Sequence, residues 1–328
     1  RTLLTLPLRI ALAYLRLIPD VAIRMLRCDI LATGYIGQLD TIVLAPIAKL
    51  CGKPVLMNPL VTLTDTIIED RQLAPARSPV GSVVRWIDRS SLRSASLILT
   101  DTEENASYIE RNFDVPGERL HVIPVGADER FFFPARDGSS DRECLDVLFY
   151  GKFIPLHGTD TIIRAAAIVG RADPAVRFEL IGRGQEYSAA RQLAHDLRVE
   201  NVVWTEWMPE DALGDRLRQA DVALGVFGAS DKAGRVIPNK VHQSLACGIA
   251  TITRRAGPLE RHLRPDRDIV TVQPADPDAL ATAILRLRDP QLRQQIGVNG
   301  RNAWSRFASR SVVADGTRRV LERLNQGR

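Results

Sequence analysis

The sequence is poor in several features that mark particular classes of protein. Aromatic residues make up only 5% of the 328 residues and the net charge is only +5, which argues against a nucleic-acid surface of alternating aromatic and basic side chains. No apolar run reaches the ~20 residues that a membrane-spanning helix needs. No Cys-x-x-Cys pair, Walker loop or Gly-x-Ser-x-Gly elbow is present, so we expect reduced thiols in a cytoplasmic protein without a metal site.

What remains is the composition of a soluble globular chain. Hydrophobic residues make up 45% and charged residues 25%, as in ordinary folded domains. The length is sufficient for two cores. A polar, turn-rich stretch at 134–143 predicts the boundary between them. We therefore expect an amino-terminal domain over 1–136 and a second domain over 144–303.

Strand and helix patterns alternate along the chain, which predicts an α/β fold with doubly wound parallel sheets. In the first half the expected strands are 29–33, 54–57, 97–100 and 121–124. In the second half they are 146–150, 176–182, 201–204, 221–226, 249–253 and 268–272. Ligands bind at the carboxyl ends of strands in such sheets. The loops that follow the strands are therefore the first places to look for a site.

The most informative loop follows the expected strand 146–150. It runs from Gly151-Lys152 to His157-Gly158 and leads into a helical pattern. The glycines let the backbone approach a ligand, the two basic side chains supply charge, and the helix N-terminus adds partial positive charge. We interpret this loop as an anion pocket. The alternative is a tight turn in which the glycines serve only the turn geometry.

A second basic segment, Pro238-Asn239-Lys240-x-x-Gln243, occurs later in the same predicted domain. We expect Asn239 to cap a helix. Arg235 and Lys240 add positive charge for an anion at the helix start. The Gln243 amide can hydrogen-bond sugar or ribose hydroxyls. The alternative is a solvated polar stripe on an ordinary helix.

Other motifs in the second half are weaker. Gly182 and Gly184 follow a strand and would allow close approach of a nucleotide, but paired glycines at strand ends are common in α/β proteins. Asp266-Arg-Asp268 suggests a metal–diphosphate site, as does a second pair that begins at Asp276. We expect Asp276 to cap a helix instead, and we predict no metal at either pair.

The first half offers one candidate group of site residues. Asp65, Asp70 and Arg71 lie in a polar, proline-containing stretch at 58–80, which we expect to be a long loop. They could position an acceptor hydroxyl if the loop faces a ligand. A solvated loop without such a role is the alternative.

The beginning of the chain is unusual because residue 1 is arginine, and we expect that the true beginning is missing. The first thirty residues combine many leucines with five arginines and two aspartates. This pattern fits a basic amphipathic helix at an anionic membrane surface. It also fits ordinary sheet-covering helices broken at Pro19.

An ordered set of motifs resembles glycosyltransferase family 4, whose members are retaining enzymes of the GT-B fold. Each motif alone is weak, but their combination in this order is fairly specific. The resemblance covers the chain from about Asp29 to its end. The motifs are Leu99-Thr-Asp-Thr-Glu103, Val122-Ile-Pro-Val-Gly-Ala-Asp128, Phe149-Tyr-Gly-Lys152, Pro155-Leu-His-Gly158, Leu180-Ile-Gly-Arg-Gly184 and Pro238-Asn-Lys240 with Ala246-Cys-Gly248.

The resemblance implies two Rossmann-like domains that face each other across a cleft, with a final segment, 304–328, that returns to the first domain. The second domain would bind a nucleoside diphosphate sugar as co-substrate, with no other cofactor. The first domain would bind a glycan, lipid-linked or small-molecule acceptor. The family's basic pair on the donor diphosphate falls on Lys152 and His157, which we predict to be catalytic. We predict donor binding by the remaining candidates, Gly151, Gly158, Gly182, Gly184, Arg235, Asn239, Lys240 and Gln243.

The sequence departs from the family at three positions, the first of which is His157, where the family more often has lysine. The family's usual pair of glutamates falls on Arg235 and Gln243, so we expect a divergent subfamily. Two other functions stay open: a nucleotide-sugar epimerase or phosphorylase on the same fold, and a degenerate GT-B subunit that serves as a scaffold for a partner enzyme. Contact with nucleic acid is not expected. Two alternatives stay open for the membrane: a purely soluble cytoplasmic enzyme, and one in peripheral contact with the inner membrane leaflet.

Overall fold

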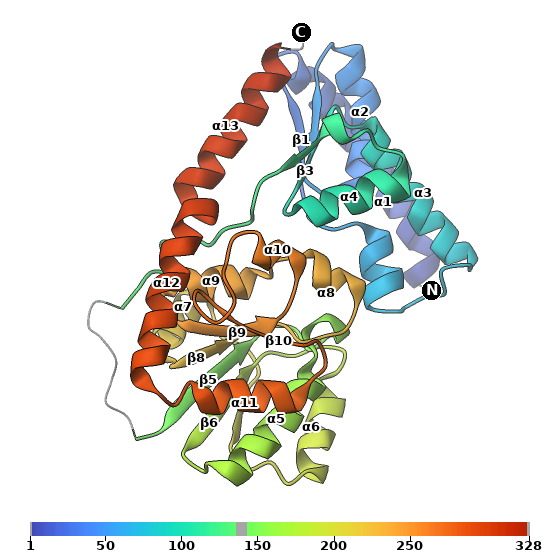
Figure 1. Cartoon of the computed structure of the whole chain (residues 1–328). Helices are drawn as coiled ribbons and strands as arrows, with labels where there is room; N and C mark the ends of the chain where they lie inside the picture. Colours follow the sequence, from blue (N-terminus) through green and yellow to red (C-terminus); the bar gives the residue numbers. More distant parts are fainter. Residues whose placement is uncertain (1, 136–142, 327–328) are drawn as a thin grey trace. The chain divides into compact units, whose positions relative to one another are not determined.

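The computed structural model describes residues 2–135 and 143–326, and the chain forms two compact α/β units (Figure 1). Unit 1 comprises Arg1–Ile123 and Gly316–Arg328, and unit 2 comprises Pro124–Asp315. The division therefore comes before the predicted boundary, and Phe132 is buried in the core of unit 2. Most of the predicted linker lies outside the described residues.

Unit 1 is built on a four-stranded parallel sheet. Its strands, in the order β1-β2-β3-β4, are β1 (Leu31–Thr33), β2 (Val55–Met57), β3 (Leu97–Thr100) and β4 (Leu120–Val122). Its helices are α1 (Thr2–Met25), α2 (Gln38–Leu50), α3 (Pro79–Ser94), α4 (Glu103–Phe113) and the 3₁₀ turn η2 (Gly117–Arg119). Each strand was expected from the sequence within two residues at either end.

Two local expectations for unit 1 were wrong. Helix α1 continues through Pro19, because a proline within a helix removes one hydrogen bond without always ending the helix. Part of the stretch 58–80 forms a π-helix, η1 (Thr64–Asp70), in place of a continuous loop. The Asp88 carboxylate fixes the start of η1, since it accepts hydrogen bonds from the Leu63 and Thr64 amides at 2.9 and 2.7 Å.

Unit 2 is built on a six-stranded parallel sheet. Its strands, in the order β10-β9-β8-β5-β6-β7, are β5 (Leu145–Tyr150), β6 (Val176–Ile181), β7 (Val202–Thr205), β8 (Val222–Leu224), β9 (Ala250–Arg254) and β10 (Val270–Val272). The order reverses between β5 and β8. A ligand is expected in the crevice at the carboxyl ends of these two strands, where the connections run in opposite directions.

Helices cover both faces of this sheet (Figure 1). They are α5 (Thr159–Ala172), α6 (Tyr187–Asp196) and α11 (Pro277–Arg286) on one face and α7 (Glu210–Gln219), α9 (Asn239–Cys247) and α12 (Pro290–Ala308) on the other. Three short elements lie in the connections: η3 (Pro155–His157), α8 (Asp231–Arg235) and α10 (Gly257–Glu260). Along β5, Val147 and Phe149 join the first core, whereas Leu148 and Tyr150 join the second. This alternation directs Tyr150 toward α9.

The last helix, α13 (Arg310–Gln326), begins in unit 2 and ends in unit 1. Val320 and Leu324 are buried in a small cluster with Leu56 of β2 and Leu97 of β3. Trp304, at the start of the segment predicted to return to the first domain, belongs instead to the core of unit 2. Among the helices of the described residues, none combines the length and the apolar character needed to cross a bilayer.

Candidate functional site

The β5–α5 loop and the start of α9 bring two basic side chains next to Gly151. The backbone of Gly151 has a φ of +139°, and a Cβ atom placed there would lie 2.9 Å from Lys240 Nζ and 3.0 Å from His157 Cε1. A side chain at position 151 would therefore occupy the space between these groups. The sequence predicted this meeting of the two basic segments, and the strand reversal at β5 and β8 explains it.

Lys240 is the most unusual group of the site because its charge is buried. The residue is 6% exposed, and Nζ has no hydrogen-bond partner within residues 2–135 and 143–326. Nζ lies 4.2 Å from the centroid of the Phe149 ring, a cation–π contact that compensates part of the lost hydration. Burial lowers the pKa of Lys240 well below its ordinary value. An anion beside Nζ would restore the charged form, since an opposite charge raises the pKa of an amine.

His157 lies on the other side of Gly151, and its orientation is fixed. Its Nδ1 is hydrogen-bonded to the backbone carbonyl of Lys152, which can only accept, so the hydrogen is on Nδ1. The pKa of His157 is well below its ordinary value because of burial and, secondarily, the charge of Lys240. In the neutral ring Nε2 is therefore an acceptor. It becomes a donor to a phosphate oxygen only when the ring gains a proton.

Lys152 differs from these two groups because its side chain is exposed. Its backbone carbonyl positions His157, but the structure does not bury its ammonium beside Gly151. From the sequence we expected the leading role for Lys152 and a supporting one for Lys240. The structure places Lys240 nearest to the glycine, a detail that depends on the position of α9 in the tertiary structure.

Gln243 lies one helical turn after Lys240 and is held by a buried tyrosine. The Tyr150 hydroxyl donates to Gln243 Oε1 at 3.0 Å and lies 3.3 Å from the backbone carbonyl of Lys240. Burial raises the pKa of Tyr150 well above its ordinary value, so the hydroxyl stays a donor. With its oxygen engaged in this way, Gln243 keeps Nε2 as a donor for a ligand.

The start of α9 is built differently from the prediction. Pro238 occupies the N-cap, and Asn239 is the first helical residue, with an exposed side chain and no capping hydrogen bond. The expectation that Asn239 caps the helix was wrong because the proline takes that position. The end of α9 is as expected, with Gly248 in the left-handed conformation. Arg235, the last residue of α8, is half-buried.

The glycines that follow the strands allow close contact between loops. A Cβ on Gly158 would lie 2.6 Å from the amide nitrogen of Gly228, and one on Gly182 would lie 2.0 Å from the Gly151 carbonyl. Gly184 likewise contacts the backbone of Phe153. Gly228 was missed from the sequence, although it follows strand β8. These contacts give the glycines a packing role, and their role in donor binding stays a prediction.

The three acceptor-side candidates belong to unit 1. Asp65 and Asp70 are each only 2% exposed, and both lie in η1. Arg71 follows η1 and is half-buried. The solvated-loop interpretation of these residues was therefore wrong. Asp65 lines a small hollow together with Thr100 and Asn105, and contact with an acceptor stays a prediction.

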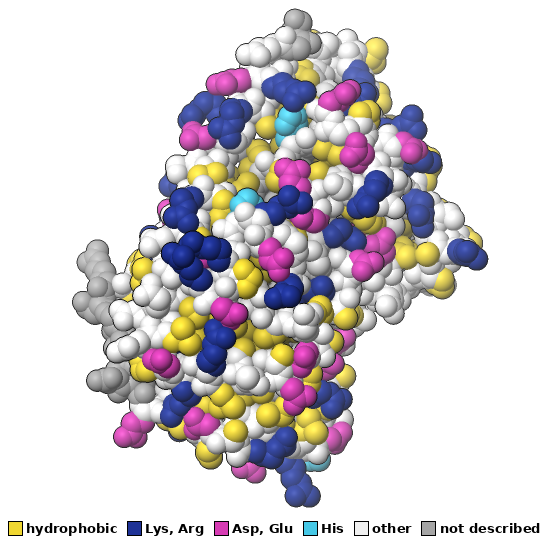
Figure 2. All heavy atoms as spheres, viewed as in Figure 1, with side chains coloured by type: hydrophobic (Ala, Val, Ile, Leu, Met, Phe, Trp, Pro, Cys, Tyr) yellow, Lys and Arg dark blue, Asp and Glu magenta, His cyan; other side chains and the backbone are white. Residues whose placement is uncertain are grey.

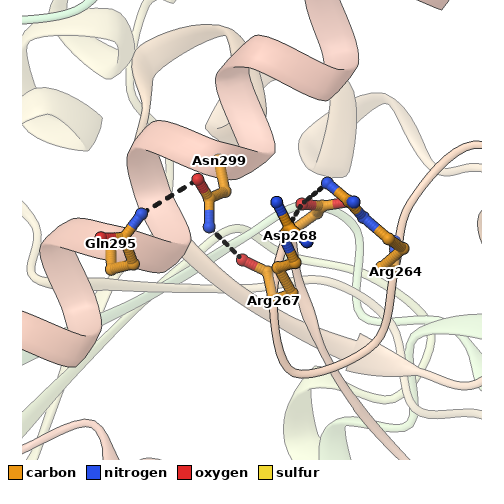
Figure 3. A network of polar contacts seen from close by, with 5 residues as sticks. All are labelled: Arg264, Arg267, Asp268, Gln295 and Asn299. Atoms are coloured by element: carbon orange, nitrogen blue, oxygen red, sulfur yellow. Dashed lines mark hydrogen bonds and ion pairs between the residues drawn. The ribbon is translucent and has the colours of Figure 1, made fainter.

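The two Asp-x-Asp motifs have structural roles, and Figure 3 shows the contacts of the first. Asp268 is 2% exposed and accepts hydrogen bonds from the Arg264 guanidinium at 2.9 and 3.1 Å. Beside it, Asn299 of α12 donates to the carbonyl of Arg267 at 3.1 Å. Asp276 caps α11 through the amide of Ala279, as expected. Within the described residues, no group of three or more His, Cys, Asp or Glu side chains could hold a metal ion.

Comparison with known proteins shows relatives over most of the chain. Residues 3–126 match the model of the glycosyl transferase 4-like domain, and residues 145–289 match that of glycosyl transferases group 1. A D-inositol 3-phosphate glycosyltransferase of Acidothermus cellulolyticus is 30% identical over 257 residues, which cover 73% of this chain and 56% of that protein. An MMP α-(1→4)-mannosyltransferase of Mycolicibacterium hassiacum is 29% identical, over 78% of this chain and 64% of that protein.

The chain thus spans less than two thirds of the length of these two curated relatives. Among solved structures, HepE of Anabaena in complex with UDP is similar with a TM-score of 0.72 and 16% identity, over 95% of this chain and 82% of that one. This likeness confirms the predicted fold class of two parallel-sheet α/β domains. Because the two matched family models fall on units 1 and 2 in turn, the chain belongs to the group 1 glycosyltransferases with a 4-like amino-terminal domain, that is, to glycosyltransferase family 4.

Proposed function

We propose that the protein transfers a sugar from a nucleoside diphosphate sugar to a glycan, lipid-linked or small-molecule acceptor, with retention of the anomeric configuration. The observation that carries this proposal is the buried Lys240 side chain beside Gly151 and His157, whose Nζ has no hydrogen-bond partner among the described residues. A buried charge without a hydrogen bond is costly unless a ligand provides a partner. A diphosphate provides such a partner at the place where this type of sheet binds ligands.

In the proposed reaction a bond forms between an acceptor oxygen and the anomeric carbon while the bond from that carbon to the diphosphate breaks. The proton of the acceptor hydroxyl passes to the departing diphosphate. Negative charge grows on the diphosphate, so cationic groups around it lower the barrier. Lys240, a protonated His157 and the exposed Lys152 would provide that charge, and we propose no metal ion or further cofactor.

The donor's remaining groups would meet the start of α9. The Gln243 Nε2 amide would donate a hydrogen bond to a hydroxyl of the sugar nucleotide. The family usually has a carboxylate at this position. HepE, which has the same fold, was solved with UDP and with UDP-glucose, and one relative is named a mannosyltransferase. We therefore place glucose and mannose nucleotides first among candidate donors.

A thermal-shift titration with UDP, GDP and ADP tests the binding step. A nucleotide at a hundred times its dissociation constant adds ~2.7 kcal/mol to the free energy of unfolding. If none of the three nucleotides stabilises the protein, the transferase proposal fails and the result favours the scaffold function. Mass detection of products from UDP-glucose and GDP-mannose then separates transfer from epimerisation, which needs no acceptor.

The variant Lys152→Ala tests the charge at the diphosphate during transfer. Loss of one such stabilising group typically costs ~3 kcal/mol in the barrier, so turnover should fall about a hundredfold or more. The side chain of Lys152 is exposed, so the fold should be unaffected. Normal turnover by this variant would remove its proposed role.

We also propose that the enzyme works in the cytoplasm, with peripheral contact at the inner membrane leaflet. Exposed apolar side chains on α1 support this, among them Leu15 and Ile23 at 67% and 62% exposure. Arg16 and Arg24 are exposed on the same helix. Such a contact would bring a lipid-linked acceptor to the enzyme.

A further inference from the structure

Helix α3 of unit 1 exposes large apolar side chains on its outer side, which is unusual for a surface that faces only water. Its inner face buries Val84, Asp88 and Leu92 against the unit. On the outer side Val80, Val83 and Trp86 are 54%, 55% and 59% exposed. A large aromatic side chain next to two valines on an exposed surface indicates a binding surface.

A strip of arginines accompanies these apolar residues. Arg85, Arg89 and Arg93 are exposed and lie four residues apart, so they follow one another along the helix. The apolar residues lie three apart and form a second strip. With about 100° of rotation per residue, Arg93 projects close to Trp86, and the two strips converge toward the carboxyl-terminal end of α3. Figure 2 shows basic and hydrophobic side chains next to each other over this helix, at the right of the view.

The exposed charges of α3 itself are all basic. The only acidic residue of α3 is Asp88, which is 1% exposed and bonded to the start of η1. Arg89 forms an ion pair with Asp114. Arg85 and Arg93 have no ion pair within the described residues. Arg77, just before the helix, is also exposed and adds to the same charge.

We propose that α3 is a docking surface for an anionic lipid bilayer. Val80, Val83 and Trp86 would enter the boundary between headgroups and acyl chains, where tryptophan is favoured. Arg85 and Arg93 would bind lipid phosphates, each through a planar guanidinium. An apolar protein partner would cover the valines but would leave the arginines without counter-charges. The 16 residues of α3 are fewer than a spanning helix needs, so the helix would lie in the interface plane.

This inference rests on the proposed function in one respect, because the surface would give the enzyme access to a lipid-linked acceptor. The binding itself is measured without sugar nucleotide or acceptor. The full chain is mixed with vesicles of phosphatidylcholine alone, or of phosphatidylcholine with phosphatidylglycerol, and bound protein is separated by flotation. We expect binding to the anionic vesicles only, weakened by added salt because the attraction is screened.

Two variants examine the two strips separately. In Arg85→Glu/Arg93→Glu the partition coefficient should fall by more than about 25-fold, since each basic residue near an anionic surface is worth roughly fivefold. In Trp86→Ser it should fall as well, although the charge is unchanged. The matched controls, Arg171→Glu/Arg177→Glu and Val298→Ser, change exposed residues of unit 2 in the same way and should bind as the unaltered protein does.

A fluorescence measurement locates the contact. Trp86 is the only tryptophan among residues 1–203, so a blue shift on addition of anionic vesicles should disappear in Trp86→Phe. Equal binding to neutral vesicles, or unchanged binding by both α3 variants, would overturn the proposal. So would a dimer in sedimentation velocity that only the α3 variants dissociate, because the surface would then serve a second copy. If nucleotides still stabilise these variants, the donor site is intact in them. This result does not depend on whether the variants bind vesicles.

Discussion

A Cβ atom on Gly151 would lie 2.9 Å from Nζ of Lys240, although 89 positions of sequence separate the two residues. The strand reversal between β5 and β8 brings them together. Because Gly151 has no side chain, the space beside Lys240 Nζ is open to a ligand. Gly151 and Lys240 therefore form the two sides of one candidate anion site, and each residue can be tested by substitution.

Lys240→Met should stabilise the protein and abolish nucleotide binding. Burial lowers the pKa of Lys240, so the folded state disfavours the charged form that the unfolded chain carries at neutral pH. Methionine removes that cost with a side chain of similar length. We expect a higher melting temperature and no shift with UDP, GDP or ADP. A nucleotide-dependent shift in this variant would contradict the assignment of Lys240 to the diphosphate.

Gly151→Ala should weaken nucleotide binding by placing a methyl group between Lys240 and His157. The φ of +139° also strains any residue other than glycine, so the melting temperature should fall. Gly52→Ala is a matched control, since Gly52 has a φ of +67° and open space around its Cβ position. It should lose stability without losing nucleotide affinity. Equal affinity in the two variants would show that position 151 does not face the ligand.

Nucleotide binding at neutral pH should take up a proton. Burial and the Lys240 charge keep the pKa of His157 well below its ordinary value in the free protein, so the ring is neutral there. A diphosphate next to it raises that pKa. Calorimetric titrations in two buffers of different ionisation enthalpy should therefore differ in their observed heats. The difference should become smaller in His157→Gln, where Lys240 is left to take up a proton. Buffer-independent heats in the unaltered protein would refute the proton uptake.

Gln243→Glu should strengthen binding of the donor sugar nucleotide. A carboxylate would still accept from the Tyr150 hydroxyl, which now donates to Gln243 Oε1, and would also accept from donor hydroxyls. Hydrogen bonds to charged groups contribute about 1.5–3 kcal/mol, against roughly 1 kcal/mol for neutral ones. Gln243→Leu should weaken binding. If both variants bind with unchanged affinity in isothermal titration, Gln243 does not contact the donor.

His242 should make the protein less stable in acid. Burial, and then the charge of His262, lower its pKa from 6.5 to about 3, and its Nδ1 accepts from Trp304 Nε1 at 3.2 Å. As the pH falls, the unfolded chain binds the proton before the folded protein does. The contribution of His242 to the free energy of unfolding is therefore fully present only above pH 6.5. It should fall by up to about 1.4 kcal/mol per pH unit below that value. Urea unfolding at several pH values measures the slope, which should become smaller in His242→Asn.

The sequence by itself determined the fold class and the segments that carry the candidate site. Each expected strand of both sheets is present, because apolar runs between turn residues depend on local composition. Glycines next to basic residues at strand ends were visible for the same reason. Two expectations based on local sequence were wrong, and both involved a proline. Helix α1 continues through Pro19, and Pro238 takes the N-cap of α9 that was expected for Asn239.

Only the tertiary structure decided which charge is buried. Lys152 follows Gly151 in a loop, and Lys240 comes two residues after Pro238 at the start of a helix, but these neighbours do not indicate which of the two ammonium groups is buried. The crossover from β8 to α9 places Lys240 over Phe149, while Lys152 stays in solvent. In the same way Asp65 and Asp70 read as loop residues until η1 buries them. Burial depends on which distant segments pack together, and a sequence pattern records only its own neighbours.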